Sequence, residues 1–227
     1  MTGRVTIGIV DYGMGNRRSV QKALDHVGAR TVLAADIDHL QASDGLVVPG
    51  VGAFPQGMRN LSGRGLDALV RGWAHDRRPL LGICLGMQLL FERSDELAAT
   101  DGLSLIPGQI TRLQSAGMRI PHIGWNDVRF ERPSALTAGL PVAGRPFYHV
   151  HSFAARPSEP DDVVGTTLYG ERFTTIVARG SVFGVQFHPE KSSADGLRLL
   201  RNFVQICRSG STDMAWGGSA GSISLPA

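Results

Sequence analysis

The sequence predicts an α/β fold, a three-layer domain whose open, mostly parallel sheet carries added antiparallel strands. Over residues 4–94, continuously apolar runs alternate with helix-spaced segments, which is typical of parallel strands covered on both faces. After about residue 100 the apolar runs become short and closely spaced, with turn residues between them, which favours antiparallel strands. The chain has 227 residues, 42% of them hydrophobic, enough for one domain with a sizeable core.

The first half is expected to alternate strands with helices. The expected strands are 4–10, 30–35, 79–84, and a run within 44–54 that is closed by Pro49 and Gly50. The expected helices are one that carries Val20, Ala23, Leu24 and Val27 on its apolar face and stops at Gly28, one over 61–73, and one over 85–94.

The second half is expected to form mainly strands. The runs are LSLIPGQITRL, WNDVRF, PFYHVHSF, DVVGTTLY, TTIVARG and SVFGVQF. A helix over 192–207, with Leu200 and Phe203 on its apolar face, is expected to close a single domain at 1–208. Residues 209–227 are rich in Gly and Ser and have little to bury, so we expect a disordered tail.

Composition limits the cellular compartment and the kinds of partner that are expected. Two cysteines, no signal peptide at the N-terminus and no apolar run of ~18 residues predict a cytoplasmic protein without a membrane segment. The net charge of +3 comes from scattered Lys and Arg residues, so nucleic acid is not an expected partner.

Cys84 lies in Gly82-x-Cys84-x-Gly86, between an apolar run and a helix-forming run. This is the pattern of a nucleophile elbow, in which glycines leave room for a strained strand-to-helix turn. At the N-terminus of a helix the thiolate is favoured over the thiol. The alternative is a buried structural cysteine, which is the usual role of an isolated one.

His188 ends an apolar strand and is followed by Pro189 and Glu190. Among the seven histidines of the chain, its place at a strand end is the one that suits a catalytic base. If the extended conformation continues through Pro189, the imidazole and the Glu190 carboxylate point to one side, as a general base and its orienting partner do. The alternative is a strand-end histidine beside an exposed glutamate.

The segment Pro49-Gly50-Val51-Gly52 follows an apolar strand. Its glycines allow bare backbone to approach a reacting carbonyl, so Val51 and Gly52 are candidate oxyanion-hole residues, with the N–H of Leu85 as the other donor. A loop that simply requires positive φ is an equally open interpretation.

Taken together and in this order, these motifs resemble those of the class I, or triad, glutamine amidotransferases, over about residues 5–207. Within that family the resemblance is to the glutaminase subunits of imidazole glycerol phosphate synthase. The segments that carry it are DYGMGN (11–16), PGVGAF (49–54), GICLGMQLLFE (82–92), PHIGWN (121–126) and GVQFHPEKS (184–192).

The resemblance implies the class I amidotransferase fold, which is flavodoxin-like, and a triad of Cys84, His188 and Glu190. It implies hydrolysis of L-glutamine to glutamate and ammonia through a thioester, with no metal and no cofactor. It also implies substrate contacts at Gln88, Glu96, Ser152 and Phe153. Gln88 lies one helical turn beyond Cys84, so its place on the same face agrees with helical geometry. Many relatives have tyrosine at the position of Phe153.

Because ammonia is mostly protonated at neutral pH, a glutaminase must deliver it along a shielded path to the enzyme that uses it. The resemblance implies that this partner is a (β/α)8-barrel cyclase subunit, which forms a heterodimer with this chain in histidine biosynthesis. The residues implied to face the cyclase are Asn16, Trp125, Tyr148 and Lys191. A core position for Trp125 is the alternative.

Three other functions remain open from the sequence. The chain resembles, less closely, glutaminases that serve other synthases, such as those for anthranilate or pyridoxal phosphate. A cysteine peptidase or γ-glutamyl hydrolase of the same fold has related motifs. A binding module that has lost activity is the third, and the presence of Cys, His and Glu together argues against it.

Overall fold

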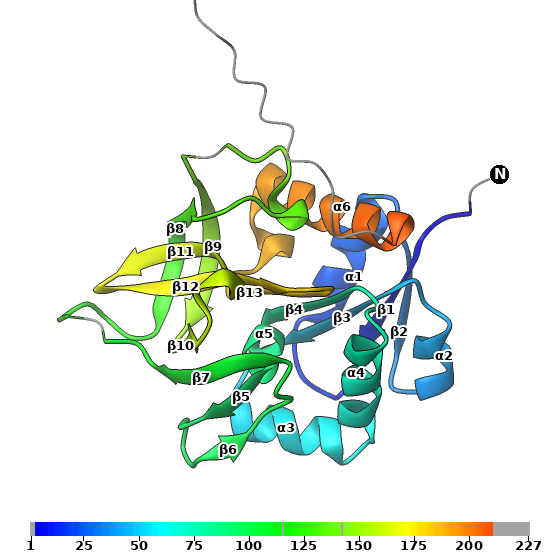
Figure 1. The fold of residues 1–227 in the computed structure, drawn as a ribbon, viewed down its shortest axis with the longest axis horizontal. Coiled ribbons are helices and arrows are strands. Elements are labelled where there is room, and N and C mark those ends of the chain that lie inside the picture. The colour runs from blue at the N-terminus through cyan, green and yellow to red at the C-terminus, as the bar shows by residue number, and fades with distance from the viewer. Residues whose placement is uncertain (1–2, 115, 142, 211–227) are drawn as a thin grey trace, which may run out of the picture.

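The computed structural model describes residues 3–114, 116–141 and 143–210, and one mixed sheet runs through them (Figure 1). Its strand order is β2-β1-β3-β4-β13-β12-β10-β7-β5-β6, with β11 paired to β12 and β8, and β9 paired to β8. The strands β2, β1, β3, β4 and β13 are mutually parallel, and the rest are joined mainly by antiparallel pairs. The predicted α/β class, a parallel core with added antiparallel strands, is confirmed.

The elements follow the chain in this order. The strands are β1 (Thr6–Val10), β2 (Arg30–Ala34), β3 (Gly45–Gly50), β4 (Leu80–Cys84), β5 (Phe91–Ser94), β6 (Thr100–Asp101), β7 (Ile106–Arg112), β8 (His122–Phe130), β9 (Arg145–His151), β10 (Phe153–Pro157), β11 (Val163–Tyr169), β12 (Glu171–Arg179) and β13 (Val182–Val185). The α-helices are α1 (Arg17–His26), α2 (Ile37–Gln41), α3 (Phe54–Ser62), α4 (Leu66–His75), α5 (Leu85–Leu89) and α6 (Ser193–Ser209), and short 3₁₀ turns are η1 (Ala135–Thr137), η2 (Pro160–Asp162) and η3 (Pro189–Lys191).

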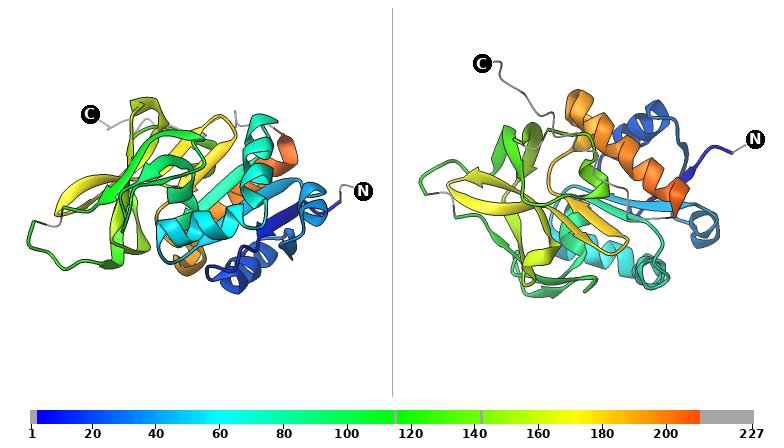
Figure 2. Two further views of the ribbon diagram at one scale, coloured as in Figure 1. Left: turned by 90° about the horizontal axis from the view of Figure 1, so that it is seen from below. Right: turned by 45° about the horizontal axis from the view of Figure 1, so that its top comes forward.

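Helices cover both faces of the parallel strands (Figure 1). One apolar cluster joins α1 and α6 to one face, and a second joins α3 and α4 to the other. The central strand β3 is buried along its whole length, and it alternates between the two clusters: Val47 belongs to the first, Leu46 and Val48 to the second. This is why the parallel strands appear in the sequence as continuous apolar runs. Figure 2 shows the antiparallel strands standing to one side of this helix-covered core.

The register of the central strands decides where the chemistry lies. β3 and β4 pair in parallel, so that Gly50 lies opposite Cys84 at their carboxyl ends. On the other side of β4, Ile83 pairs with Val185, the last residue of β13. Three segments singled out in the sequence therefore leave the sheet side by side at one edge, the place where open α/β sheets bind ligands.

Two of the predicted helices are wrong in extent. The expected helix over 61–73 is two helices, because the chain turns between Ser62 and Leu66, where Gly65 is left-handed (φ 67°). The first of them, α3, starts at Phe54, ahead of the predicted start at residue 61. Ala53 precedes it and has no side chain to cap it, but the carboxylate of Glu96 accepts a hydrogen bond from the Phe54 N–H at 2.7 Å. A cap supplied from 42 residues away has no local signature in the sequence.

The expected helix over 85–94 ends early. α5 stops at Leu89, and residues 91–94 form strand β5, which pairs in parallel with β7 and antiparallel with β6. Local propensity favoured a helix here, but pairing with β7 buries Phe91 completely, and tertiary packing overrides propensity. The short helix α2 was not predicted; Asp36 caps it by accepting from the His39 N–H.

Strands occupy the six apolar runs of the second half. The last of them, β13, pairs in parallel with β4 and so belongs to the parallel core, not to the added antiparallel strands as expected. The closing helix, α6, extends two residues beyond the predicted end to Ser209. The predicted tail therefore begins inside α6, and the rest of it, from residue 211 on, lies outside the described residues. Among the described helices, none combines the length and apolar character that a membrane crossing needs.

Gly86 offers a direct test of this packing. A Cβ at this position would lie 1.7 Å from the carbonyl oxygen of Val48, so neither backbone can accommodate it. We expect Gly86→Ala to cost about 3 kcal/mol or more in the free energy of unfolding. Gly72, within α4, has no heavy atom within 4 Å of an added Cβ, and Gly72→Ala should stabilise by about 0.5–1 kcal/mol. Urea unfolding of both variants measures the contrast; equal stabilities would contradict this packing.

Candidate active site

Cys84 lies on a sharp turn between β4 and α5. Its backbone angles are φ 55° and ψ −113°, a region that residues with a side chain rarely adopt. Strand, turn and helix follow one another as the sequence predicts for an elbow. Such strain persists only where the surrounding structure imposes it, and it is typical of functional sites.

The two glycines of the elbow are required by close contact. A Cβ on Gly82 would lie 2.6 Å from the carbonyl oxygen of Gly86, and a Cβ on Gly86 would collide with β3. The turn is therefore pressed against its own helix and against the neighbouring strand. Helix α5 has only five residues, so its dipole at Cys84 is weaker than that of a long helix.

His188 and Glu190 meet behind the sulfur. The His188 Nδ1–H donates to Glu190 Oε1 at 2.9 Å, and the two side chains are 3% and 1% exposed. The Cys84 side chain lies next to the His188 ring and acts on its charge. Thiol, imidazole and carboxylate are thus buried side by side, as the sequence predicts for a nucleophile, a base and an orienting group.

The route to this contact differs from the predicted one. The backbone does not stay extended through Pro189, because Pro189–Lys191 forms the turn η3. The turn still brings Glu190 back to the ring. His188 is held at both ends of its backbone: its N–H donates to the Tyr148 carbonyl at 2.9 Å, and the Ser192 hydroxyl donates to its carbonyl at 2.6 Å.

These neighbours control the charge of His188. Burial alone would lower the pKa of the imidazole, but the hydrogen bonds to Cys84 and Glu190 and the negative charges of both groups raise it to about 10. At neutral pH the ring is therefore held as an imidazolium. Next to a thiol, an imidazolium stabilises the thiolate, the reactive form of the sulfur.

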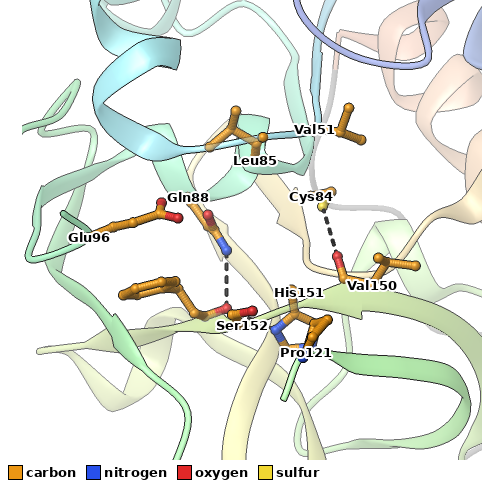
Figure 3. Close-up of a pocket in the computed structure, with 11 residues that line it drawn as sticks. Val51, Cys84, Leu85, Gln88, Glu96, Pro121, Val150, His151 and Ser152 are labelled. Atoms are coloured by element: carbon orange, nitrogen blue, oxygen red, sulfur yellow. Dashed lines mark hydrogen bonds between the residues drawn. The ribbon is translucent and has the colours of Figure 1, made fainter. Parts of the chain in front are cut away.

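A pocket of about 230 Å³ opens in front of the sulfur (Figure 3). Its volume suits a ligand of amino-acid size. The lining residues are Val51, Gly52, Cys84, Leu85, Gln88, Glu96, Pro121, Val150, His151, Ser152 and Phe153. All of the predicted oxyanion residues and substrate-contact residues are in this set, and His188 lies behind it rather than on its wall.

The segment after β3 forms one wall of the pocket. Gly52 has φ 111°, in the region that favours glycine, and Val51 is 42% exposed. The segment therefore needs positive φ, and it also brings backbone to the pocket. Tyr12, in the N-terminal DYGMGN motif, holds it in place, because its hydroxyl donates to the Pro49 carbonyl at 2.7 Å.

Polar groups gather at the end of the pocket away from the sulfur. The Gln88 Nε2 donates to the Phe153 carbonyl at 3.1 Å and to Gln186 Oε1 at 3.0 Å (Figure 3 shows the first of these bonds). The Gln88 amide is therefore fixed with its nitrogen turned toward the protein. Glu96 is half-buried and lies on the same wall, with Oε2 bonded to the start of α3.

Sequence reasoning missed one buried polar residue of the site. Gln186, two residues before His188, bonds to Gln88 and directs its Nε2 toward the Cys84 sulfur at 3.8 Å. It lies at even spacing from a residue that was singled out, so strand alternation would have placed it on the same side. His151, in the HSF segment (151–153) that the resemblance implies for substrate binding, also lines the pocket. The sulfur also contacts the Val150 carbonyl at 3.8 Å.

Three of the four residues predicted to face a partner lie together. Trp125 on β8 pairs across the sheet with Tyr148 on β9, with ring centroids 6.2 Å apart, and the Lys191 ammonium is 5.8 Å from the centre of the Tyr148 ring. Trp125 is 54% exposed, so the alternative of a core aromatic is wrong. Asn16 is half-buried and lies at the start of α1.

The apolar surface around Trp125 is larger than one residue. Ile123, two residues earlier on the same strand face, is 59% exposed and pairs with Val150, which also lines the pocket. Exposed apolar groups gathered on one face are typical of a protein-binding surface. In the described part of the chain, His, Cys, Asp and Glu side chains form no group of three or more that is arranged to hold a metal ion.

Comparison with known proteins agrees with this site. The sequence model of the family "Glutamine amidotransferase class-I" matches residues 8–207. The chain is 52% identical over 202 residues to the imidazole glycerol phosphate synthase subunit HisH of Moorella thermoacetica, covering 89% of this chain and 95% of that protein. It is 45% identical to the HisH subunit of Geobacillus kaustophilus, covering 88% and 96%.

Solved structures at lower identity share the fold. A crystal structure of a glutamine amidotransferase superposes with a TM-score of 0.68 at 21% identity, covering 88% of this chain and 98% of that one. PurLQS from Thermotoga maritima gives 0.71 at 17% identity, covering 89% and 99%. With its elbow, its buried Cys-His-Glu set and relatives that match over nearly their whole length, this chain belongs to the class I glutamine amidotransferases, among the glutaminase subunits of imidazole glycerol phosphate synthase.

Proposed function

We propose that this chain hydrolyses L-glutamine through a Cys84-His188-Glu190 triad and passes the ammonia to a cyclase subunit. The cyclase binds at the surface formed by Ile123, Trp125, Tyr148 and Lys191, called here the Trp125 face. The observation that carries the proposal is the buried hydrogen bond between His188 and Glu190 beside the Cys84 thiol, behind a pocket of amino-acid size. The carboxylate and amide at the far end suit the polar backbone end of glutamine, and the sulfur suits its side-chain amide.

In the first half of the reaction the Cys84 thiolate attacks the side-chain carbonyl carbon of glutamine and forms a C–S bond. The negative charge that develops on the carbonyl oxygen is stabilised by N–H groups of the segment Val51–Gly52 and of Leu85. The tetrahedral intermediate collapses as the C–N bond breaks. The His188 imidazolium gives its proton to the leaving nitrogen, so ammonia departs and a γ-glutamyl thioester remains on the sulfur.

In the second half the now neutral His188 takes a proton from a water molecule, which attacks the thioester carbon. A second tetrahedral intermediate collapses with cleavage of the C–S bond. Glutamate leaves, and the thiolate–imidazolium pair is restored. Glu190 keeps its bond to Nδ1 throughout, so it orients the ring and stabilises the cation while both protons move at Nε2.

The product requires a partner. Ammonia released into water at neutral pH is mostly protonated and lost as a nucleophile, so it must be delivered along a shielded path. The Trp125 face adjoins the pocket, because Val150 both lines the pocket and pairs with Ile123 on that face. We assign this face to the cyclase subunit, with a (β/α)8-barrel fold, and Trp125 and Tyr148 as its anchoring aromatics.

The alternatives have less support. Glutaminases that serve anthranilate or pyridoxal phosphate synthesis share the elbow, but the similarity to HisH subunits extends over nearly the whole of those relatives. A peptidase needs an open cleft for a chain, and this pocket holds about 230 Å³. A silent binding module has no need for a strained cysteine beside a buried histidine.

Replacement of Cys84 tests the proposed chemistry. In the complex with the cyclase and its nucleotide ligand, Cys84→Ala should lower glutamine hydrolysis at least ~10³-fold, because it removes the sulfur that forms the acyl intermediate. The measurement is glutamate release with and without the cyclase.

The other cysteine provides the control. Burial raises the pKa of the Cys207 thiol, and this residue lies on the apolar side of α6. Cys207→Ala should keep wild-type activity. A glutamine-analogue diazo ketone should label the wild-type protein once, at Cys84. Turnover that survives Cys84→Ala, or a label at Cys207, would overturn the proposed chemistry.

Replacement of Lys191 tests the proposed partner surface. Lys191→Ala removes the cation next to the Tyr148 ring and should raise the cyclase concentration needed for half-maximal glutaminase stimulation about fivefold. The melting temperature should stay that of wild type, because Lys191 is exposed. Arg208→Ala, in the last turn of α6 and about 22 Å along that helix from its start, is the charge-matched control. Equal effects of the two variants would contradict this assignment.

A further inference from the structure

Three buried histidines beside the pocket take no part in the proposed reaction. His122 on β8 and His149 and His151 on β9 are at most 6% exposed. His122 and His151 are direct cross-strand partners, and the His122 ring is stacked on that of Tyr169 with centroids 4.0 Å apart. Buried polar side chains are costly unless they are hydrogen-bonded, so their partners indicate what they do.

The first link of this cluster is Asn126. Its Oδ1 accepts from the Asp127 N–H at 2.9 Å, and its Nδ2 donates to the Leu168 carbonyl at 3.0 Å, so both ends of the amide are assigned by backbone partners. The same Nδ2 lies 3.2 Å from His122 Nε2. Because the amide nitrogen can only donate, His122 Nε2 is the acceptor, and the ring proton of His122 is on Nδ1.

The second link continues in the same direction. His122 Nδ1 lies 3.1 Å from His151 Nε2, so His122 donates and His151 accepts. His151 Nδ1 lies 2.8 Å from the Phe153 carbonyl oxygen, which can only accept, so the His151 proton is also on Nδ1. The assignment made from Asn126 and the one made from Phe153 agree at the bond between the two rings.

This arrangement has room for no second proton on either ring. A proton on His122 Nε2 would face the Asn126 N–H, and one on His151 Nε2 would face the His122 N–H. Burial lowers the pKa of His122 to about 4, and burial together with the charges of His122 and His188 lowers that of His151 to about 3. Both rings are therefore neutral at physiological pH, each in a single tautomer.

The series of hydrogen bonds from Asn126 through His122 and His151 ends at the glutamine pocket. The Phe153 carbonyl that accepts from His151 also accepts from Gln88, and Gln88 donates its other N–H to Gln186, whose own Nε2 points to the Cys84 sulfur. With both N–H groups of Gln88 directed into the protein, its carbonyl oxygen is left for the pocket. The position of the Phe153 carbonyl thus sets the orientation of the Gln88 amide.

We propose that Asn126, His122 and His151 form a one-way hydrogen-bond chain that positions the Phe153 carbonyl and, through it, the Gln88 amide for binding of glutamine. The inference rests on the proposed function and adds three positioning residues to it. Because the chain orients groups that bind the unreacting part of the substrate, it acts on the ground state and the transition state alike. Its loss therefore affects KM rather than kcat.

The test compares two substitutions at one position. His122→Phe keeps an aromatic ring on Tyr169 but removes both ring nitrogens, and it should raise KM for glutamine about tenfold with kcat changed less than about twofold. His122→Asn places an amide N–H near the position of Nδ1, where it can still donate to His151, and it should hold KM within about threefold of wild type. Both are measured on the full chain in complex with the cyclase and its nucleotide ligand.

His149→Phe is the matched control. His149 is equally buried in the same cluster, but it bonds to the Phe147 carbonyl and the Thr175 hydroxyl and not to Asn126, His122 or His151. His149→Phe should lower the melting temperature about as much as His122→Phe does, and it should leave KM at the wild-type value. A KM that rises equally in His122→Phe and His149→Phe would overturn the proposal, since packing alone would then explain it.

A second measurement does not depend on catalysis. Nitrogen-15 NMR of histidine-labelled wild-type chain should show His122 and His151 as neutral rings protonated at Nδ1. Protonation of His151 at Nε2 would overturn the inference even if glutamine is hydrolysed. Absence of glutamine hydrolysis by the wild-type complex would instead count against the proposed function. The tautomer assignment would then be judged from the nitrogen-15 NMR spectrum alone.

Discussion

The positive φ of Cys84 is the constraint on which the rest of the site depends. It turns the chain out of β4 sharply enough to present the sulfur at the sheet edge, and it leaves no space for side chains on Gly82 or Gly86. The elbow in turn fixes its neighbours. Gly50 of β3 lies opposite Cys84. A Cβ there would come within 2.3 Å of the Tyr12 hydroxyl and 2.9 Å of Leu85, so the strand that brings backbone to the pocket also needs glycine at this position. Close packing around the elbow and Tyr12 thus explains glycines in two separate motifs.

The site lies where two kinds of sheet meet. The parallel core supplies the elbow and the segment after β3, and the antiparallel strands supply the pocket's other wall, including Val150 and Phe153. The strand pair β8–β9 carries residues with proposed roles on both of its faces. Its inner face carries His122 and His151 toward the glutamine pocket, and its outer face carries Trp125 and Tyr148 toward the proposed partner. Strand alternation therefore puts the proposed substrate positioning and the proposed partner binding on opposite sides of the same two strands.

Sequence patterns predicted the α/β class, most strands and the meeting of Cys84, His188 and Glu190, because these depend on local periodicity and on glycines with a steric purpose. What they missed depends on long-range contact. Phe91 was expected in a helix, but pairing with β7 makes it strand, and α3 is capped by Glu96 from far along the chain. The contact of His188 with Glu190 was predicted for the wrong backbone, since a 3₁₀ turn and not an extended segment brings them together. The histidine chain was missed although His122 and Asn126 lie in the PHIGWN segment, because the hydrogen bond from His122 to His151 exists only through cross-strand register.

The central claim is that Cys84 and His188 form a thiolate–imidazolium pair, and titration of the His188 ring by NMR tests it most directly. In the wild-type chain the ring should stay protonated far above pH 6.5, the ordinary pKa of histidine, because the charges of Cys84 and Glu190 outweigh the effect of burial. In Cys84→Ala, which removes the thiolate and keeps Glu190, the pKa of His188 should fall. A wild-type ring that titrates near pH 6.5, unchanged by the substitution, would contradict the pairing.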